Sequence, residues 1–311
     1  MSPKTADRQL LVGKLAFRAT DGLVLVTLAF ITLLTLLFHR RVEGWGLLAL
    51  KNIGAALVYL AALYFGERFT NKIRRFFLRM AGILFVFAYI NLAVAKLQLI
   101  IYNRWLDGSV LSMEKAIFGI QPTLWLQQFI SRPLTEWMFF SYVSYLILYP
   151  ALCGLIFFRK GERAAEDFLF VLGLANVFCD LGFLLYPVAG PLAHMGSQYT
   201  VPLDGYVWTY LGEYFRIHWQ FVGGTIPSPH CANATVMWLM AYRYHRSSFW
   251  ILSPVILSLY LSTVYCRYHY VTDSVVGVAA GLLVWAVAPA YKNVWDRAVE
   301  RQAMHWRGAR T

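Results

Sequence analysis

The sequence has few charged residues for its length. Asp, Glu, Lys and Arg make up only 14% of its 311 residues, whereas 59% are hydrophobic. A soluble domain is about 25% charged and about half apolar, so this composition excludes an ordinary soluble domain. Acidic residues are fewer than basic ones: 16 Asp and Glu stand against 28 Lys and Arg, which gives a net charge of +12.

Cysteine is scarce as well, and its placement excludes the common metal and redox modules. None of the 4 cysteines forms a CxxC pair, and no cluster of His, Cys and carboxylates has metal-ligand spacing. We therefore expect no metal and no cofactor. Cys231 and Cys266 each neighbour a polar motif, so a disulfide or reactive thiol is kept as the minor alternative to simple apolar packing.

Long apolar runs take the place of the missing charge. A membrane-spanning helix needs about 20 largely apolar residues, and Trp and Tyr flank many of the runs, as they do at membrane interfaces. The sequence thus predicts an all-α polytopic membrane protein. Eight spans are expected, at residues 22–38, 45–65, 80–100, 137–158, 168–188, 231–244, 249–266 and 271–291.

The basic residues are divided unequally between the two sides of these spans. The termini and the loops on their side carry 19 Lys and Arg, and the opposite loops carry 7. Cytoplasmic loops are enriched in Lys and Arg, so both termini are predicted to be cytoplasmic. The positive charge then reflects orientation in a lipid bilayer, and no nucleic-acid partner is expected.

Three polar elements fall together on the predicted outer face. They are residues 186–191, residues 227–230 (Pro-Ser-Pro-His) and the stretch that runs from Ser262 to Asp273 through His269. Ionisable groups beside a membrane span are costly and tend to be functional. The outer loops 102–136 and 189–226 are expected to form an interfacial helix and a lid or access rim.

The histidines suit acid–base or nucleophilic chemistry. His269 and Asp273 are four residues apart, so the two side chains share one helical face if Asp273 begins the last span. The carboxylate then fixes one imidazole nitrogen and leaves the other free to attack. His230 opens another helix, so one histidine can attack while the other protonates a leaving oxygen. The alternative is a His–Asp pair that only joins two helix ends.

Other residues near these histidines suit a phosphate. Ser228 precedes a helix, which makes it an N-cap and places it at a helix N-terminus, where anions bind. Gly224 allows close backbone approach. Arg267 is a fixed cation, and in an extended segment its side chain points to the same side as His269. The alternative for Arg267 is an interfacial, snorkelling arginine.

These motifs together resemble the type 2 phosphatidic acid phosphatase superfamily, and most closely its inositol phosphorylceramide synthase-like branch. The resemblance covers residues 105–285. Its motifs are Phe118-Gly119-x-x-Pro122, Tyr186-Pro187-x-x-Gly190-Pro191, Pro227-Ser228-x-His230, and Ser262 followed by Arg267-Tyr268-His269-Tyr270-x-x-Asp273.

The resemblance implies a fold and a set of roles. The fold would be a six-helix core (residues 76–291) that follows two extra N-terminal spans (1–75) and precedes a basic tail (292–311). His269 would be the nucleophile that forms a phosphohistidine, with Asp273 orienting it. His230 would be the general acid and then the base, and Gly190 would belong to the substrate-binding set. No metal is implied.

Three cations usual in the superfamily are missing here. Trp125 stands where a Lys is common, Thr263 replaces an arginine, and Leu192 occupies a position that is often cationic. Arg267 is the expected substitute, with Arg104, Arg216, Lys96 and His194 as weaker candidates.

The leading hypothesis is an enzyme that takes a phosphoryl or phospho-headgroup from a membrane lipid and transfers it to a lipid alcohol. The alternative within this class is a lipid phosphatase, in which water is the acceptor. A lipid transporter or scramblase is the hypothesis from another class, and it predicts ionisable residues at mid-depth in several spans. A catalytically inactive partner subunit is a third.

Overall fold

The computed structural model describes residues 10–12, 15–219 and 221–308. These residues are almost entirely helical. A short antiparallel hairpin of β1 (Leu10–Val12) and β2 (Leu15–Phe17) precedes the first helix. The two chain termini, which the charge count assigns to the cytoplasm, lie outside the described residues.

Seven helices are long and apolar enough to cross a membrane, which confirms a polytopic all-α membrane protein. They are α1 (Ala19–Leu37), α2 (Trp45–Gly66), α3 (Lys72–Ala95), α6 (Arg132–Lys160), α7 (Glu162–Leu185), α11 (Arg246–Tyr265) and α12 (Val271–Gly308). The remaining predicted span is the helix α10 (Pro229–Tyr244), which has only 16 residues.

Local sequence explains where several helices begin and end. The Asn71 side chain accepts hydrogen bonds from two amides of the first turn of α3, as an N-cap does. Ser228 caps α10, and Pro229 follows it at the first helical position. Gly161 separates α6 from α7 with a φ of 87°, a backbone conformation that glycine adopts without strain.

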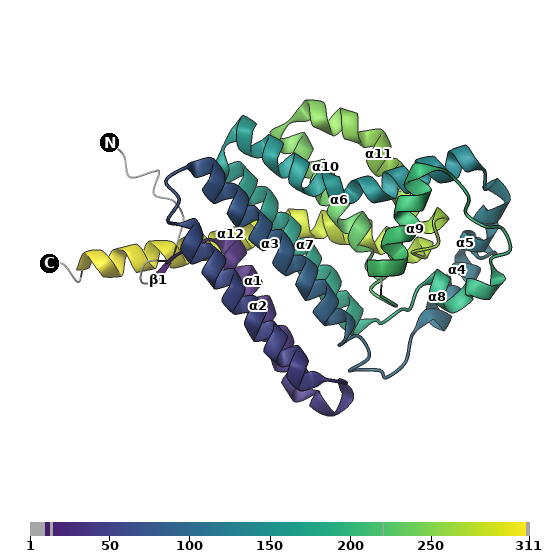
Figure 1. Cartoon of the computed structure of the whole chain (residues 1–311), viewed down its shortest axis with the longest axis horizontal. Helices are drawn as coiled ribbons and strands as arrows, with labels where there is room; N and C mark the ends of the chain where they lie inside the picture. Colours follow the sequence, from purple (N-terminus) through teal and green to yellow (C-terminus); the bar gives the residue numbers. More distant parts are fainter. Residues whose placement is uncertain (1–9, 13–14, 220, 309–311) are drawn as a thin grey trace.

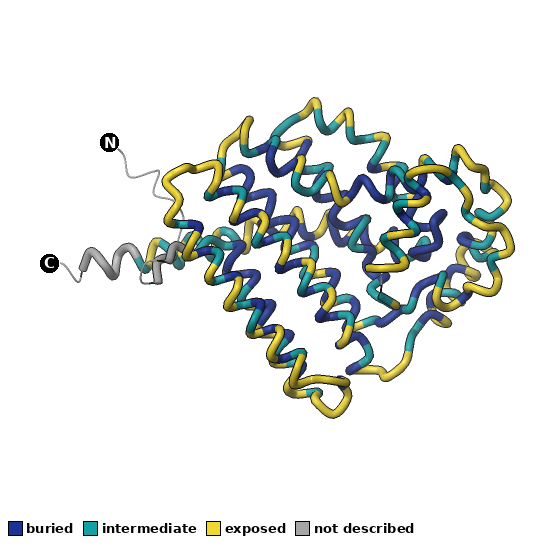
Figure 2. The backbone as a smooth tube through the Cα atoms, viewed as in Figure 1, coloured by how far each residue is buried: buried dark blue, intermediate teal, exposed yellow. Residues whose placement is uncertain are grey.

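Helix α10 lies at the centre of the molecule. It packs against α6, α7, α11 and α12, and every residue from 231 to 237 is buried. Buried residues gather where the helices face one another, whereas outward faces are exposed (Figure 2). Many exposed residues on the long helices are large and apolar, such as Leu50 and Trp250, as expected for surfaces that meet lipid.

Short helices form a cap at one end of the bundle. They are α4 (Asp107–Phe118), α5 (Pro122–Trp125), η2 (Leu126–Phe129), α8 (Pro191–Met195), η3 (Gly196–Gln198) and α9 (Val207–Trp219). They gather at the right of Figure 1, at the opposite end from β1 and the last turns of α12. The two long loops predicted on the outer face are therefore folded, and together these segments, residues 102–136 and 189–226, form this cap.

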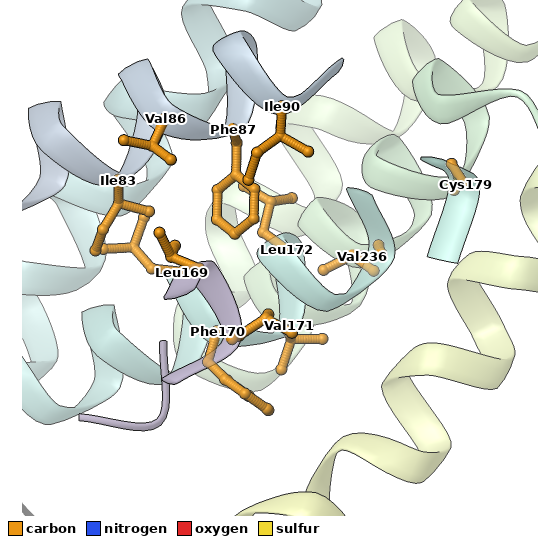
Figure 3. Close-up of a cluster of buried hydrophobic side chains, with 14 of the residues drawn as sticks. Ile83, Val86, Phe87, Ile90, Leu169, Phe170, Val171, Leu172, Cys179 and Val236 are labelled. Atoms are coloured by element: carbon orange, nitrogen blue, oxygen red, sulfur yellow. The ribbon is translucent and has the colours of Figure 1, made fainter. Parts of the chain in front are cut away.

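The N-terminal helices are joined to the rest of the bundle by close packing. Figure 3 shows Ile83, Val86, Phe87 and Ile90 of α3 beside residues 169–172 of α7. A β-carbon at Gly173 would lie 2.4 Å from the Phe87 ring, so this glycine permits the contact. Van der Waals packing of this kind drives helix association in lipid, where apolar burial contributes little.

A buried charge network reinforces this joint. Asp21 of α1 accepts hydrogen bonds from Arg79 of α3 and, at 2.5 Å, from Tyr59 of α2. Arg79 also donates to Glu166 of α7 at 3.0 Å, and Arg18 donates to the same carboxylate at 2.5 Å. Buried charges are tolerated when they are paired in this way, so the network fixes the positions of α1, α2 and α3 against α7.

Two glycines bring α12 against α10. A β-carbon at Gly277 would lie 2.5 Å from the Ser228 carbonyl oxygen, and one at Gly281 would lie 2.5 Å from the Ala232 carbonyl oxygen. Small residues four apart allow two backbones to approach closely. This contact sets the distance between the start of α10 and the start of α12, where the predicted site residues lie.

Candidate active site

The two predicted catalytic histidines face each other at the cap end of the bundle. His230 is the second residue of α10, and His269 lies two residues before α12. Their ring centroids are 5.8 Å apart, with an angle of 60° between the ring planes. His269 is only 3% exposed and His230 is partly buried, so most of the surface of the pair is shielded from solvent.

The surroundings of His269 determine which of its nitrogens carries the proton. Its Nδ1 atom lies 3.0 Å from the Thr225 carbonyl oxygen and 3.6 Å from Oδ2 of Asp273. Carbonyl and carboxylate oxygens only accept hydrogen bonds, so Nδ1 carries the hydrogen and donates it to Thr225. The lone pair of the neutral ring then resides on Nε2.

Asp273 links the Pro-Ser-Pro-His segment (227–230) to the segment that contains His269. It is fully buried, and Oδ2 accepts the Tyr270 amide hydrogen at 3.0 Å, which is the N3-to-N-cap half of a capping box. The Asp273 carbonyl accepts the Ser228 amide hydrogen at 3.0 Å. The predicted pair of His269 and Asp273 is in ion-pair range, but the direct hydrogen bond of His269 goes to the Thr225 carbonyl.

Aromatic rings hold His230. It stacks on Tyr142 at a centroid distance of 4.4 Å and packs on Tyr145 at 4.6 Å. Tyr142 in turn stacks on Tyr268 at 4.4 Å. The Nδ1 atom of His230 is buried and has no hydrogen-bond partner among the described residues. Sequence reasoning missed both α6 tyrosines, because aromatic residues within a span are indistinguishable from ordinary core residues.

Asp107, which the sequence analysis also missed, ties the 186–191 loop to the histidine loop. Its carboxylate accepts the amide hydrogens of Ala189 at 2.8 Å and Gly190 at 3.0 Å, and the Tyr270 hydroxyl at 2.9 Å. Gly190 has a φ of 98°, and a β-carbon there would lie 2.9 Å from the Thr225 methyl carbon. Gly190 thus lies against the residue that orients His269.

A second carboxylate of α4, that of Glu114, accepts hydrogen bonds at the N-terminus of α12. Glu114 accepts hydrogen bonds from the amide and the hydroxyl of Thr272, at 2.8 Å and 3.2 Å. Burial raises the pKa of Glu114 above its usual range. Because Glu114 accepts the Thr272 amide hydrogen and Asp273 accepts that of Tyr270, these two amides are not free to bind a phosphate.

The predicted phosphate-binding residues Ser228 and Gly224 also have partners. The Ser228 hydroxyl oxygen accepts the Cys231 amide hydrogen at 3.4 Å, so Ser228 is an N-cap as expected. Gly224 adopts a φ of 66°, and its amide donates to Oε1 of Gln98 at 2.6 Å. Ser228 keeps a hydroxyl hydrogen to donate, whereas the Gly224 amide is already used.

Arg267 is placed differently from the sequence-based expectation. Its φ is 65°, so the segment is not extended and the argument from two-residue alternation does not apply. The guanidinium lies 4.3 Å from the centroid of the Tyr199 ring and donates to the Val201 carbonyl. Arg267 is 8% exposed, and burial lowers its pKa. It forms no ion pair with any described carboxylate.

The weaker candidate cations are less favourably placed. Lys96, Arg104 and His194 are exposed, and Arg216 donates to Glu213 at 2.8 Å and 2.5 Å. The four cysteines are free and buried, which rules out the disulfide that the sequence left open.

Comparison with known proteins gives a match to one protein family. No curated protein and no solved structure matches the chain. The family model of the PAP2 superfamily matches residues 109–287, more than half of the chain, and this range contains His230, His269 and Asp273. The chain therefore belongs to the PAP2 superfamily of membrane phosphatases and phosphotransferases.

Proposed function

We propose that this protein is a phosphohistidine-forming transferase that moves a phosphoryl or phospho-headgroup from a membrane lipid onto a lipid alcohol. The observation that carries the proposal is the hydrogen bond from Nδ1 of His269 to the Thr225 carbonyl. It leaves a lone pair on Nε2, the atom that must attack phosphorus. Asp273, 3.6 Å away, offsets the positive charge that the ring acquires when the N–P bond forms.

In the first step, Nε2 of His269 attacks the phosphorus of the lipid. A bond forms between Nε2 and phosphorus while the bond from phosphorus to the leaving oxygen breaks. Protonated His230 donates its proton to that oxygen, which leaves as an alcohol. The two ring centroids are only 5.8 Å apart, so one reacting group at the mouth of the pair can contact both histidines.

In the second step, the neutral His230 acts as a base. It removes the proton from the acceptor hydroxyl, and the acceptor oxygen attacks phosphorus as the N–P bond breaks. Both histidines then return to their starting states. The stack of Tyr142 and Tyr145 on His230 keeps the ring in one orientation through both steps.

Arg267 is the proposed phosphate ligand among the cations. Its guanidinium is buried without a carboxylate partner among the described residues, and a desolvated charge of this kind is costly unless an anion neutralises it. A phosphate oxygen would supply that anion. Ser228 keeps a hydroxyl hydrogen that it can donate to a second phosphate oxygen. The amides of Gly190 and Gly224 already donate to Asp107 and Gln98, so these glycines shape the substrate-binding loops through close packing.

The proposal favours a lipid alcohol over water as the acceptor. The likeness to the inositol phosphorylceramide synthase-like branch supports this choice, and so do the aromatic walls of Tyr142, Tyr145 and Tyr268. Hydrolysis is the competing outcome, because His230 can deprotonate water equally well. The proposed site faces the periplasmic, extracellular or lumenal side, as the 19-to-7 distribution of basic residues indicates.

A transporter or scramblase would need ionisable residues along its path. Asp180 of α7 is buried and accepts a hydrogen bond from Asn91 at 3.2 Å, whereas Lys51 and Lys96 are exposed. Asp180 alone does not make a path across the bilayer, and the charged side chains of Asp21, Arg79 and Glu166 are paired with one another. The paired His230 and His269 argue equally against an inactive partner subunit.

A lipid-extract assay tests the proposal. The purified full-length protein in detergent is given a lipid extract in the presence of EDTA, and free phosphate and new phospholipid species are followed together. New phospholipid without a matching release of phosphate is the expected result, and His269→Ala should abolish it while the exposed His218→Ala does not. Release of phosphate alone would identify a phosphatase, and an equally active His269→Ala would overturn the mechanism.

A further inference from the structure

A second polar site lies at the end of the bundle opposite the histidines. A cavity of about 360 Å³ opens between the end of α6, the start of α7, the end of α10 and the middle of α12. Along α10, its lining residue Tyr244 is 14 residues from His230, or roughly 20 Å at 1.5 Å per residue. The cavity is therefore not part of the catalytic site.

Cations dominate the lining of this cavity. Lys160, Arg163, Arg243 and Lys292 line it, and Asp167 is the one carboxylate among the lining residues. Asp167 accepts hydrogen bonds from Lys292 and, at 2.5 Å, from Tyr244, and it lies 3.5 Å from Arg243. The lining thus carries three positive charges in excess.

Two of these cations lack a carboxylate partner. Lys160 and Arg163 form no ion pair with a described residue. They lie close together, on either side of the turn between α6 and α7. Asp167 holds Arg243 and Lys292 on the other side of the cavity. Cations on two sides of a cavity of this size suit a ligand with a phosphate group rather than a single small ion.

Apolar residues of α12 form much of the remaining lining, near the end of the predicted last span. Trp285, Ala288 and Pro289 of α12 complete the wall, and Trp285 is 39% exposed. Tryptophan is enriched where lipid headgroups meet the hydrocarbon region. A wall of this kind fits the glycerol and upper acyl region of a lipid, and the charge count assigns this face to the cytoplasm.

We propose that this cavity binds the phosphate headgroup of an anionic phospholipid of the inner leaflet. Lys160 and Arg163 contact the headgroup from one side and Arg243 from the other, while Trp285 packs against the lipid backbone. Basic pockets between membrane helices on the cytoplasmic side bind anionic headgroups in this manner. The proposal is independent of the reaction catalysed at the other end of the bundle.

Lipid binding to the full-length protein in detergent tests this site. The His269→Ala background prevents turnover, and short-chain phosphatidylglycerol is titrated against phosphatidylcholine with the same acyl chains, with native mass spectrometry counting the bound lipids. Lys160→Gln combined with Arg243→Gln should weaken phosphatidylglycerol binding roughly thirtyfold, since each cation near an anionic group contributes about a fivefold factor. Phosphatidylcholine binding should not change.

The matched control removes the same charge nearby. Arg159 and Arg246 lie on the same two helix connections but do not line the cavity, so Arg159→Gln combined with Arg246→Gln should bind phosphatidylglycerol within about threefold of the parent. Equal losses in both double variants, or no loss in the cavity variant, would overturn the proposal. Displacement of the lipid by inorganic phosphate at the same concentration would also overturn it, because the site would then take a soluble anion.

Discussion

Two acceptors with different functions lie near Nδ1 of His269. The Thr225 carbonyl is the nearer and fixes the hydrogen on Nδ1. Asp273 is further away but carries the negative charge, and it is fully buried. In a site with so little exposed surface, a charge at 3.6 Å acts strongly on the ring, which becomes positive in the proposed reaction.

Asp273→Asn separates these two functions. The asparagine oxygen can still accept the Tyr270 amide hydrogen, so the start of α12 should keep its cap and the protein its melting temperature. Turnover should nevertheless fall by roughly a hundredfold or more, because the charge is lost while the Thr225 hydrogen bond remains. Steady-state kinetics measure the effect, with the exposed Asp204→Asn as the control. A loss of less than about threefold would show that Thr225 alone suffices.

Replacement of Arg267 tests whether its buried charge serves the substrate. A charge-assisted contact to phosphate contributes about 1.5–3 kcal/mol, so Arg267→Ala should lower kcat/KM by roughly ten- to a hundredfold. Arg267→Lys should show a partial defect, because lysine keeps the charge but loses the fork of two donors. Arg132→Ala, which removes an exposed pair with Asp204, is the matched control.

The Arg267 result also separates two roles of the side chain. A purely structural role through Tyr199 and Val201 would lower the melting temperature and leave the KM for the lipid unchanged. In that case another group holds the phosphate, and Arg216 would be the next to test.

The contact between α10 and α12 governs the geometry of the site at the level of whole helices. Each histidine lies at or beside the start of one of these helices, and the two starts are joined by the hydrogen bond from the Ser228 amide to the Asp273 carbonyl. Any shift of one helix along the other would change the distance between His230 and His269.

Gly277→Ala tests this dependence. The new methyl group would lie 2.5 Å from the Ser228 carbonyl oxygen, which belongs to the backbone and cannot rotate away. Overpacking of this kind costs about 1–3 kcal/mol, so both thermal stability and kcat should fall. Gly54→Ala in α2 is the control, because a β-carbon at Gly54 would have no neighbouring atom within 4 Å, and this variant should be neutral or slightly stabilising. Equal behaviour of the two variants would contradict the helix-contact account.

Sequence patterns predicted the long helices better than the contacts of the cap. Apolar runs and their capping residues are local signals, so the seven long helices could be recognised, whereas the remaining expected span, residues 231–244, is the short helix α10. Asp107 and Glu114 were missed because their partners Tyr270 and Thr272 lie 163 and 158 residues further along the chain. The left-handed backbone at Arg267 was missed for a related reason, since nothing in the local sequence distinguishes it from an extended segment.

The histidines and Asp273 could be proposed as site residues because they form spaced motifs between apolar runs. Thr225 could not, because it contributes a backbone carbonyl, and every residue has one. Tyr142 and Tyr145 carry no distinguishing pattern within α6. The sequence thus predicts the reacting groups, whereas their orientation becomes visible only in three dimensions.

Orientation of the whole molecule in the membrane decides which leaflet supplies the substrate. Gly196 of the cap and Lys160 at the opposite end are both exposed, and the four native cysteines are buried, so single cysteines at these two positions can be labelled with little background. An impermeant maleimide should label Gly196→Cys in intact cells and Lys160→Cys only after permeabilisation. The reverse pattern would place the catalytic site at the inner leaflet.

Direct detection of the covalent intermediate is the most decisive measurement of the proposed chemistry. The full-length protein is mixed with its lipid substrate, quenched in base, where phosphohistidine survives, digested, and analysed by mass spectrometry. We predict a phosphorus-containing adduct on the peptide that contains His269, lost on acid treatment and absent from His269→Ala. An adduct on His230, or turnover by wild-type protein with no adduct under rapid quenching, would contradict the assignment of His269 as the nucleophile.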